Sequence, residues 1–320
     1  KDTLLMILER YIEQKNKDGI TSDRTYLRDT ETLNQIKKTC NNWINKPIQK
    51  VTVENIEDSK ENMRKYSNST IDKIWISLKK GFKIAYARRK IPYNIMEDET
   101  LTKPISKKAA KVVTALSKKE EKKLIKILIS NKHKYNNILL LQLYTGMRIG
   151  EVLALSKDCI NFKNNTITVY RTITRNIHGK AILGEHTKTF DKKTGIDNGK
   201  RTFTMKPNVK EIIQKIYSNK ITNINNLLFW DYDKNFFITD GEVNSYLTRL
   251  NNKYKILDNP NETLSTHRLR HTFITRCQEN GVSLPVIQKI VGHVKGSKIT
   301  NNIYTDVSLD FITKELKKIQ

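Results

Sequence analysis

Five basic side chains and one tyrosine stand at widely spaced points in the C-terminal two-thirds of the chain: Arg148, Lys188, His267, Arg270, His293 and Tyr304. Two guanidinium groups can bind the non-bridging oxygens of one phosphodiester bidentately, and histidines can donate further hydrogen bonds to it. A tyrosine hydroxyl can attack the phosphorus of a phosphodiester held in this way. This chemistry requires no metal ion and no cofactor. The residues therefore predict a phosphate-binding site that carries its own nucleophile.

Arg148 follows Gly146, where the chain can turn tightly and direct a guanidinium into a cleft. Glu151 comes three residues after Arg148, on the same face of a helix, and can hold Arg148 or a neighbouring side chain. The alternative is an ordinary surface ion pair between the two. His267 and Arg270 have the same spacing, so an imidazole and a guanidinium can meet one phosphate.

Other assignments compete with these residues. Arg268 and His271 lie on the same expected helix, and His267 with His271 has the i, i+4 spacing of two metal ligands. No carboxylate or third ligand is spaced to complete such a site, so we expect no metal there. His293 could be a structural histidine bonded to a backbone carbonyl. Tyr304 is one of 13 tyrosines, and only its position after Gly-His and before a terminal helix distinguishes it.

In order, type and local context the series resembles the catalytic signature of the tyrosine recombinases, the phage and transposon integrase family. The resemblance is carried by Thr145-Gly-Met-Arg-Ile-Gly-Glu-Val-Leu-Ala-Leu155, Thr187-Lys-Thr189, His267-Arg-Leu-Arg270, Gly292-His293 and Ile303-Tyr304. It implies that Tyr304 attacks a DNA strand and forms a 3′-phosphotyrosine. The arginines and histidines are then expected to bind the scissile phosphate, with Glu151 in support.

The same resemblance assigns protonation of the leaving 5′-oxygen to a lysine on a hairpin between two strands. Lys188, within a Thr-Lys-Thr sequence, matches the local pattern of the family, and Lys200 is the second candidate. Lys192 and Lys193 are also nearby, and the gap from Lys188 to Arg201 is longer than typical. We expect Lys188 to be the general acid, with Lys200 kept as the alternative.

The elements that must position these residues are mainly helices. Ser117 and Glu120 form a capping-box pattern that begins one helix, and Gly146 ends another. Apolar spacing and period-two alternation predict the remaining elements. They are helices over Ile138–Tyr144, His267–Asn280 and Leu284–Val291, a basic tail helix from Ser308, and strands over Thr166–Thr174 and Arg201–Met205.

We expect three parts: a helical core-binding domain over residues 1–92, a basic linker over 93–113, and a catalytic domain with a C-terminal tail helix over 114–320. The basic amphipathic segment Ser69–Lys90 resembles the last helix of the core-binding domain in the family, although Asn94-Ile95 replaces the usual Asn-Pro. An exposed linker of this charge can follow a phosphate backbone, and the alternative is a simple flexible tether. The fold class implied is mainly α with a small antiparallel β-sheet. The helical domain and a mixed α/β tyrosine-recombinase catalytic domain would form a C-shaped clamp on DNA.

The net charge of +26 has the sign that attracts a polyanion and predicts a nucleic-acid partner. An AT-rich genome and solvated helix faces explain part of the lysine content. Cys40, Cys159 and Cys277 show no spacing of a disulfide framework or zinc site, which favours a reducing cytoplasm. No stretch approaches 18 apolar residues, so no membrane association is expected.

These features predict a site-specific DNA recombinase, the integrase of a phage or conjugative transposon, that integrates or excises a mobile element. Its substrate would be double-stranded DNA carrying recombination sites, near the nucleoid in the cytoplasm. Exchange of four strands implies a homo-tetramer on DNA, and the family analogy adds exchange of the C-terminal tail. An excisionase or DNA-bending protein is a further expected type of partner. The alternatives are a chromosome-dimer resolvase, a type IB topoisomerase-like enzyme, or a catalytically silent DNA-binding protein of the same fold.

The chain begins with Lys and not Met, so we expect an N-terminal segment to precede it. The family resemblance implies an arm-binding domain at that place, but the sequence does not tell what the segment contains. Neither the target DNA sequence nor the bias between integration and excision can be read from the residues. Base specificity depends on groove contacts and DNA deformability, whereas phosphate contacts carry no sequence information.

Overall fold

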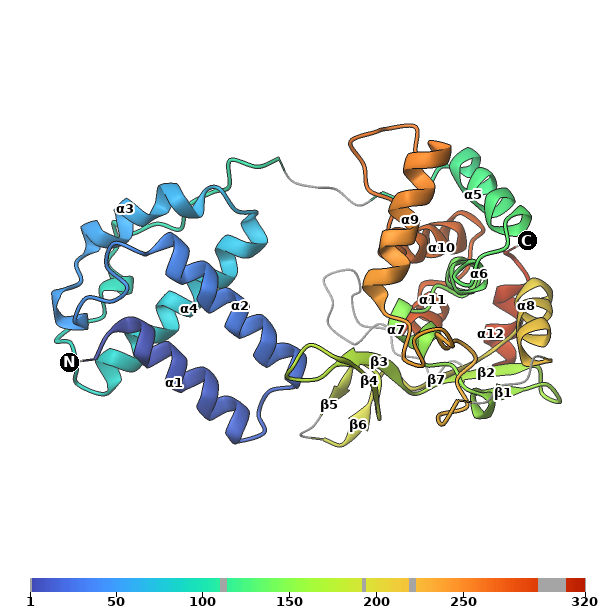
Figure 1. Cartoon of the computed structure of the whole chain (residues 1–320), viewed down its shortest axis with the longest axis horizontal. Coiled ribbons are helices and arrows are strands. Elements are labelled where there is room, and N and C mark those ends of the chain that lie inside the picture. The colour runs from blue at the N-terminus through green and yellow to red at the C-terminus, as the bar shows by residue number, and fades with distance from the viewer. Residues whose placement is uncertain (1, 110–113, 192–193, 219–222, 293–308, 320) are drawn as a thin grey trace. The chain divides into compact units, whose positions relative to one another are not determined.

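The computed structural model describes residues 2–109, 114–191, 194–218, 223–292 and 309–319. Its contacts divide the chain into two compact units. The first comprises Lys1–Val112 with Arg175–Lys180, and the second comprises Val113–Thr174 with Ala181–Gln320. The expected fold class, mainly helical with small antiparallel sheets, is confirmed (Figure 1). The domain boundaries and the clamp arrangement stay predictions.

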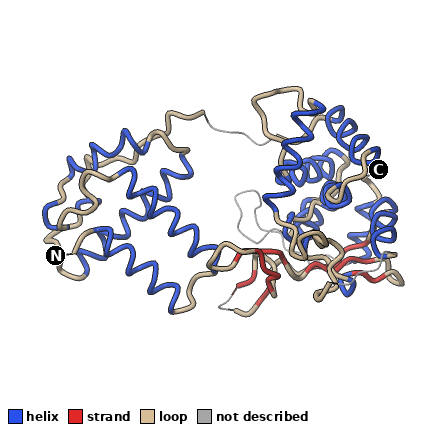
Figure 2. Tube along the Cα trace, viewed as in Figure 1, coloured by secondary structure: helices blue, strands red, loops and turns tan. Residues whose placement is uncertain are grey.

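The first unit is built from four helices. They are α1 (Leu4–Lys17), α2 (Asp23–Thr39), α3 (Val53–Met63) and α4 (Asn68–Ala87), with short 3₁₀ turns at Ile48–Lys50 and Ile95–Glu97. Thr3, Ser22 and Ser67 cap α1, α2 and α4 with side-chain oxygens that accept backbone N–H groups. The apolar faces meet in a core that includes Trp43 and Phe82. Figure 2 shows only helices and loops over residues 2–109.

The first part of the predicted linker is held by contacts within this unit. Ile95, Met96 and Leu101 are buried in the core of the four helices. Farther on, the backbone N–H of Ser106 donates to Oδ1 of Asn68 at 2.8 Å. This part of the predicted linker therefore packs as part of the helical unit, because the side chains of Ile95, Met96 and Leu101 are buried in its core.

The second unit contains the remaining helices. They are α5 (Lys118–Ser130), α6 (Asn136–Thr145), α7 (Ile149–Leu153), α8 (Pro207–Tyr217), α9 (Asp240–Tyr254), α10 (Thr266–Glu279), α11 (Leu284–Val291) and α12 (Leu309–Leu316). The predicted capping box at Ser117 and the predicted stop at Gly146 are confirmed. α6 is apolar on nearly all sides and packs against α5, α8 and α10 (Figure 1). This packing brings α10 alongside the end of α6.

The strands form three small sheets. They are β1 (Ile160–Asn161), β2 (Thr166–Val169), β3 (Thr172–Arg175), β4 (Ala181–Gly184), β5 (Phe190–Asp191), β6 (Ile196–Asp197) and β7 (Arg201–Thr204). β2 lies between β1 and β7, antiparallel to both. β3 pairs with β4, and β5 pairs with β6. The predicted strand at Arg201 is confirmed as β7.

The prediction of a single strand over Thr166–Thr174 is wrong. β2 ends at Val169 and β3 begins at Thr172. Between them, the side chains of Tyr170 and Arg171 both bond to the carboxylate of Asp158. The alternation of residue types in the sequence continues across the break, so the sequence does not reveal that its two halves pair with different strands.

Among the helices that the structure describes, none is both long and apolar enough to cross a membrane.

Candidate active site

Gly146 ends α6 and leads the chain to Arg148. Its φ of +64° lies in the left-handed region, and a Cβ at this position would meet Cδ1 of Phe273 at 2.2 Å. The position therefore requires glycine. Two residues later, the backbone N–H of Arg148 donates to Oε2 of Glu151 at 2.9 Å and begins α7. The turn places the guanidinium of Arg148 beside the carboxylate of Glu151.

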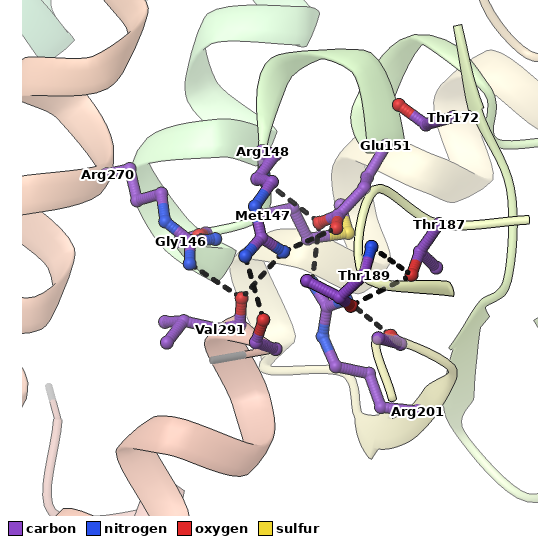
Figure 3. Close-up of polar contacts among 12 residues, drawn as sticks. Gly146, Met147, Arg148, Glu151, Thr172, Thr187, Thr189, Arg201, Arg270 and Val291 are labelled. Atoms are coloured by element: carbon purple, nitrogen blue, oxygen red, sulfur yellow. Dashed lines mark hydrogen bonds and ion pairs between the residues drawn. The ribbon is translucent and has the colours of Figure 1, made fainter. Parts of the chain in front are cut away.

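The guanidinium of Arg148 is held at its inner side by three acceptors (Figure 3). Nη1 donates to Oε1 of Glu151 at 3.0 Å and to the backbone oxygen of Val291 at 3.4 Å. Nη2 donates to the backbone oxygen of Gly292 at 2.8 Å. The expected contact between Arg148 and Glu151 is present, and the last turn of α11 completes the support.

Arg270 reaches the same place from α10. Only 4% of this residue is exposed, and its Nη1 and Nη2 donate to the backbone oxygens of Gly146 and Val291, each at 2.7 Å. Burial, and then the positive charge of Arg148, lower the pKa of Arg270 to about 9. The side chain thus stays charged at neutral pH. Two like charges held this close create a position that favours an anion.

His267 lies one turn before Arg270 on α10, and its ring stands edge-on to that of His271 with centroids 4.7 Å apart. The residue is exposed, yet partial loss of hydration lowers its pKa, and the charges of His271, Arg270, Lys188 and Arg148 lower it further. His267 is therefore neutral at neutral pH and can donate one ring N–H.

Lys188 lies between β4 and β5, in a turn braced by its neighbours. The backbone N–H of Thr187 donates to Oδ2 of Asp197 at 2.8 Å, and the hydroxyls of Thr187 and Thr189 are 3.2 Å apart. Lys200 is exposed in the turn before β7. The backbone N–H of Lys200 donates to the backbone oxygen of Asp197 at 3.1 Å. The choice between Lys188 and Lys200 as the general acid stays a prediction.

Four residues named from the sequence lie outside the described residues: Lys192, Lys193, His293 and Tyr304. The described range before His293 ends at Gly292, the residue after α11, whose φ is +65°. Its backbone oxygen accepts from Arg148. The residue immediately before His293 thus contacts the arginine cluster directly.

Arg148, Arg201 and Arg270 form an arginine cluster around Glu151 and the end of α11, and Arg201 is the member that was not predicted from the sequence. Its Nη2 donates to Oε2 of Glu151 at 2.7 Å, and both side chains are almost wholly buried. Burial by itself would raise the pKa of Glu151, but the ion pairs with Arg201 and then Arg148 hold it below its ordinary value. A sequence signal existed: Arg201 alternates with Phe203 and Met205, and all three are buried. An arginine on the inward face of a strand predicts a buried acidic partner.

The spacing of His267 and His271 also matches that of a metal couple. Within the part of the chain that the structure describes, no group of three or more His, Cys, Asp and Glu side chains is arranged to hold a metal ion. The carboxylate of Glu151 is instead paired with Arg148 and Arg201, and the side chains around it are cationic or neutral donors. Such a set suits an anion with several oxygen acceptors, of which a phosphodiester is one.

Comparison with known sequences identifies the family. The sequence model of the Phage integrase family matches residues 114–310, which is more than half of the chain. The integrase of Staphylococcus phage L54a is 34% identical over 175 residues, covering 52% of this chain and 46% of the phage protein. The transposase of transposon Tn916 from Enterococcus faecalis is 26% identical over 273 residues, covering 79% of this chain and 62% of the transposase. The chain thus spans about half to three-fifths of the length of these relatives.

Solved structures show the same fold. The Tn1549 transposon integrase, in complex with a circular intermediate DNA, superposes with a TM-score of 0.75 at 21% identity over 100% of both chains. The lambda integrase tetramer bound to a Holliday junction gives a TM-score of 0.65 at 18% identity, covering 95% of this chain and 81% of that one. The resemblance seen in the ordered arginine, lysine, histidine and tyrosine residues is confirmed, and the chain belongs to the phage integrase family.

Proposed function

We propose that this chain is a site-specific DNA recombinase that cuts and rejoins DNA strands through a 3′-phosphotyrosine intermediate. The observation that carries the proposal is the convergence of Arg148 and Arg270 on the backbone oxygen of Val291. His267 lies one turn before Arg270 on α10, and the charges of Arg270, Lys188 and Arg148 all lower the pKa of this histidine. These four side chains supply the positive charge and donors that a scissile phosphodiester needs as charge develops on it.

Cleavage begins with the two arginines on the non-bridging oxygens of the phosphodiester. The neutral ring of His267 donates a further hydrogen bond, and we assign His293 the same role. A free phenol has a pKa of about 10, so the positive charge must stabilise the phenolate that forms as Tyr304 releases its proton to water and attacks phosphorus. The new bond joins the tyrosine oxygen to phosphorus. The bond from phosphorus to the 5′-oxygen breaks at the same time.

The leaving 5′-oxygen takes its proton from Lys188, which becomes a neutral amine. Rejoining is the reverse: a 5′-hydroxyl of the partner strand attacks the phosphotyrosine and returns a proton to the lysine, and the tyrosine leaves as a phenolate that regains a proton from water. One phosphoester is exchanged for another of similar energy. The reaction therefore calls for no ATP, metal ion or organic cofactor.

The biological role we propose is the integration or excision of a mobile element. The relatives are a phage integrase and a transposase by name, and the Tn1549 integrase was solved on DNA. The lambda integrase was solved as a tetramer on a Holliday junction. By analogy we propose a cytoplasmic homo-tetramer on double-stranded DNA, clamped between a core-binding domain and a catalytic domain, with exchange of C-terminal tails. An excisionase or DNA-bending protein is a proposed accessory partner.

A nicked duplex tests the proposal. A binding sequence is first selected by the chain from a pool of random duplexes, and nicks are then stepped through it so that cleavage releases a short strand and traps the adduct. We expect a band of protein joined to DNA on a denaturing gel, lost in Tyr304→Phe. DNA that is retarded on a native gel but never covalently joined, at any nick position, would instead identify a catalytically silent DNA-binding protein.

A further inference from the structure

Arg201 has a guanidinium in which each nitrogen donates to a different segment of the second unit. Nη2 bonds Glu151, Nη1 bonds the backbone oxygen of Gly199 at 2.9 Å, and Nε bonds the backbone oxygen of Ile290. Only 2% of the side chain is exposed. A buried charge of this kind is stabilised only when its donors are matched, so the three segments are held together at one point.

The ion pair with Glu151 changes what Arg148 can offer to a ligand. Oε1 of Glu151 accepts from Arg148 and Oε2 accepts from Arg201, so one carboxylate lies between two guanidinium groups. One positive charge in the trio is therefore left without a counterion. Arg201 is almost wholly buried, whereas 24% of the Arg148 side chain is exposed. The excess charge is thus available at Arg148, where an anion can reach it.

The bond to Gly199 links Arg201 to the turn before β7, which packs against the residues on either side of Lys188. A Cβ at Gly199 would lie 2.0 Å from Oγ1 of Thr187 and 2.5 Å from Oγ1 of Thr189, the two neighbours of Lys188. Gly199 is therefore packed against the two residues that flank Lys188 in the chain. Its N–H also donates to Oδ1 of Asp197.

The bond to Ile290 ties Arg201 to the end of α11. At Gly292, a Cβ would lie 2.8 Å from Nη1 of Arg201 and 3.3 Å from Nη1 of Arg148. The two guanidinium groups thus pack against the same glycine. The segment that leads into His293 begins from this contact.

We propose that Arg201 is a positioning residue for strand cleavage, which anchors the turn of Lys188 to the arginine cluster and so places the general acid. This inference rests on the proposed function. Arg201 acts through Gly199 and Glu151 and does not itself contact the phosphate. Its loss should therefore impair the step that depends on the lysine more than the remaining chemistry.

The test compares two scissile groups in the nicked duplex, an ordinary phosphate and one with sulfur at the 5′-bridging position. A thiolate leaves without protonation, so the sulfur substrate needs no general acid. Arg201→Lys keeps the positive charge but cannot donate to the three acceptors from a planar guanidinium. Arg201→Met removes the charge as well, and it is tested in case the lysine side chain restores some of these hydrogen bonds. Lys188→Ala gives the reference pattern for a missing acid.

Arg276→Lys is the matched control. Arg276 is also largely buried in the second unit and joins Glu121, Glu279 and the backbone oxygen of Leu116, away from the arginine cluster. Native gel shift and denaturant unfolding establish that each variant is folded and binds DNA before adduct rates are compared.

We expect Arg201→Lys to slow adduct formation on the ordinary phosphate by about 10²-fold, because a small displacement of a catalytic group has an effect of this size. The sulfur substrate should recover most of that loss, as with Lys188→Ala, whereas Arg276→Lys should affect both substrates equally. Equal slowing of both substrates by the Arg201 variants, or no slowing, would overturn the inference while the wild-type adduct still supports the function. A wild-type chain that forms no adduct on either substrate would overturn both.

Discussion

Arg148 and Arg270 donate hydrogen bonds to one backbone oxygen, that of Val291, over 3.4 and 2.7 Å. Arg148 immediately precedes α7 and Arg270 lies on α10, while the shared acceptor belongs to a third helix, α11. The spacing of the two guanidinium groups is therefore set by the end of α11. Each guanidinium has more N–H donors than these backbone bonds use, so the pair can hold an anion without giving up its support.

Replacing either arginine by lysine tests this arrangement. Arg148→Lys and Arg270→Lys keep a positive charge but lose the planar fork that reaches both the backbone and a phosphate. We expect single-turnover cleavage of the nicked duplex to fall by about 10²- to 10³-fold, the usual effect of removing one donor from a transition-state site. DNA affinity, measured by native gel shift, should change little. Cleavage close to the wild-type rate would show that the arginines do not contact the phosphate.

The general acid can be separated from its alternative by the same sulfur substrate. Lys188→Ala should slow cleavage of the ordinary phosphate by about 10²- to 10⁴-fold, since this is the range for general acid catalysis. The 5′-bridging sulfur should largely restore the rate. Lys200→Ala, in the turn before β7, is the control and should show neither effect. The opposite pattern would assign the proton to Lys200.

The conformation at Gly146 has a predicted stability effect with an internal control. Gly146→Ala should destabilise the second unit by about 1–3 kcal/mol for the left-handed backbone and by about 1–3 kcal/mol more for the clash with Phe273. Gly281 has a similar φ of +69°, and a Cβ added there would have nothing within 4 Å among the described residues. Gly281→Ala should therefore show only the backbone effect. Urea unfolding of each variant measures the difference, and equal losses would exclude the clash.

The ion pairs of Glu151 predict how stability depends on pH. The pKa of Glu151 in the folded chain lies below its ordinary value of 4.5, so the unfolded chain binds the proton more readily. The contribution of Glu151 is fully present above pH 4.5 and is lost as the pH falls towards the folded pKa. We therefore expect Glu151→Gln to be less stable than the wild type at neutral pH, with a gap that narrows in acid. Denaturant unfolding at several pH values measures the difference in free energy of unfolding between the two proteins. A difference that stays constant or widens in acid would show that the ion pairs do not contribute.

Much of the local structure could be predicted because its causes are local. The capping box at Ser117 and the stop at Gly146 each depend on residues only a few positions away. α8 is not among the predicted elements, although Pro207 at its first turn and apolar residues at helical spacing carry a clear signal. The break between β2 and β3 gives no such signal, since it depends on which strands lie alongside.

The types and order of the residues are enough to indicate the family and the class of chemistry. Which of these residues act together depends on the fold. In the sequence, Arg201 is only one residue of an alternating strand pattern. The fold places acceptors from Glu151, Gly199 and Ile290 next to its three nitrogens. Val291 likewise accepts from two arginines only when α11 packs beside α10. Burial removes water as the competing partner, so the pairing of charges is set by packing between segments that are distant in sequence.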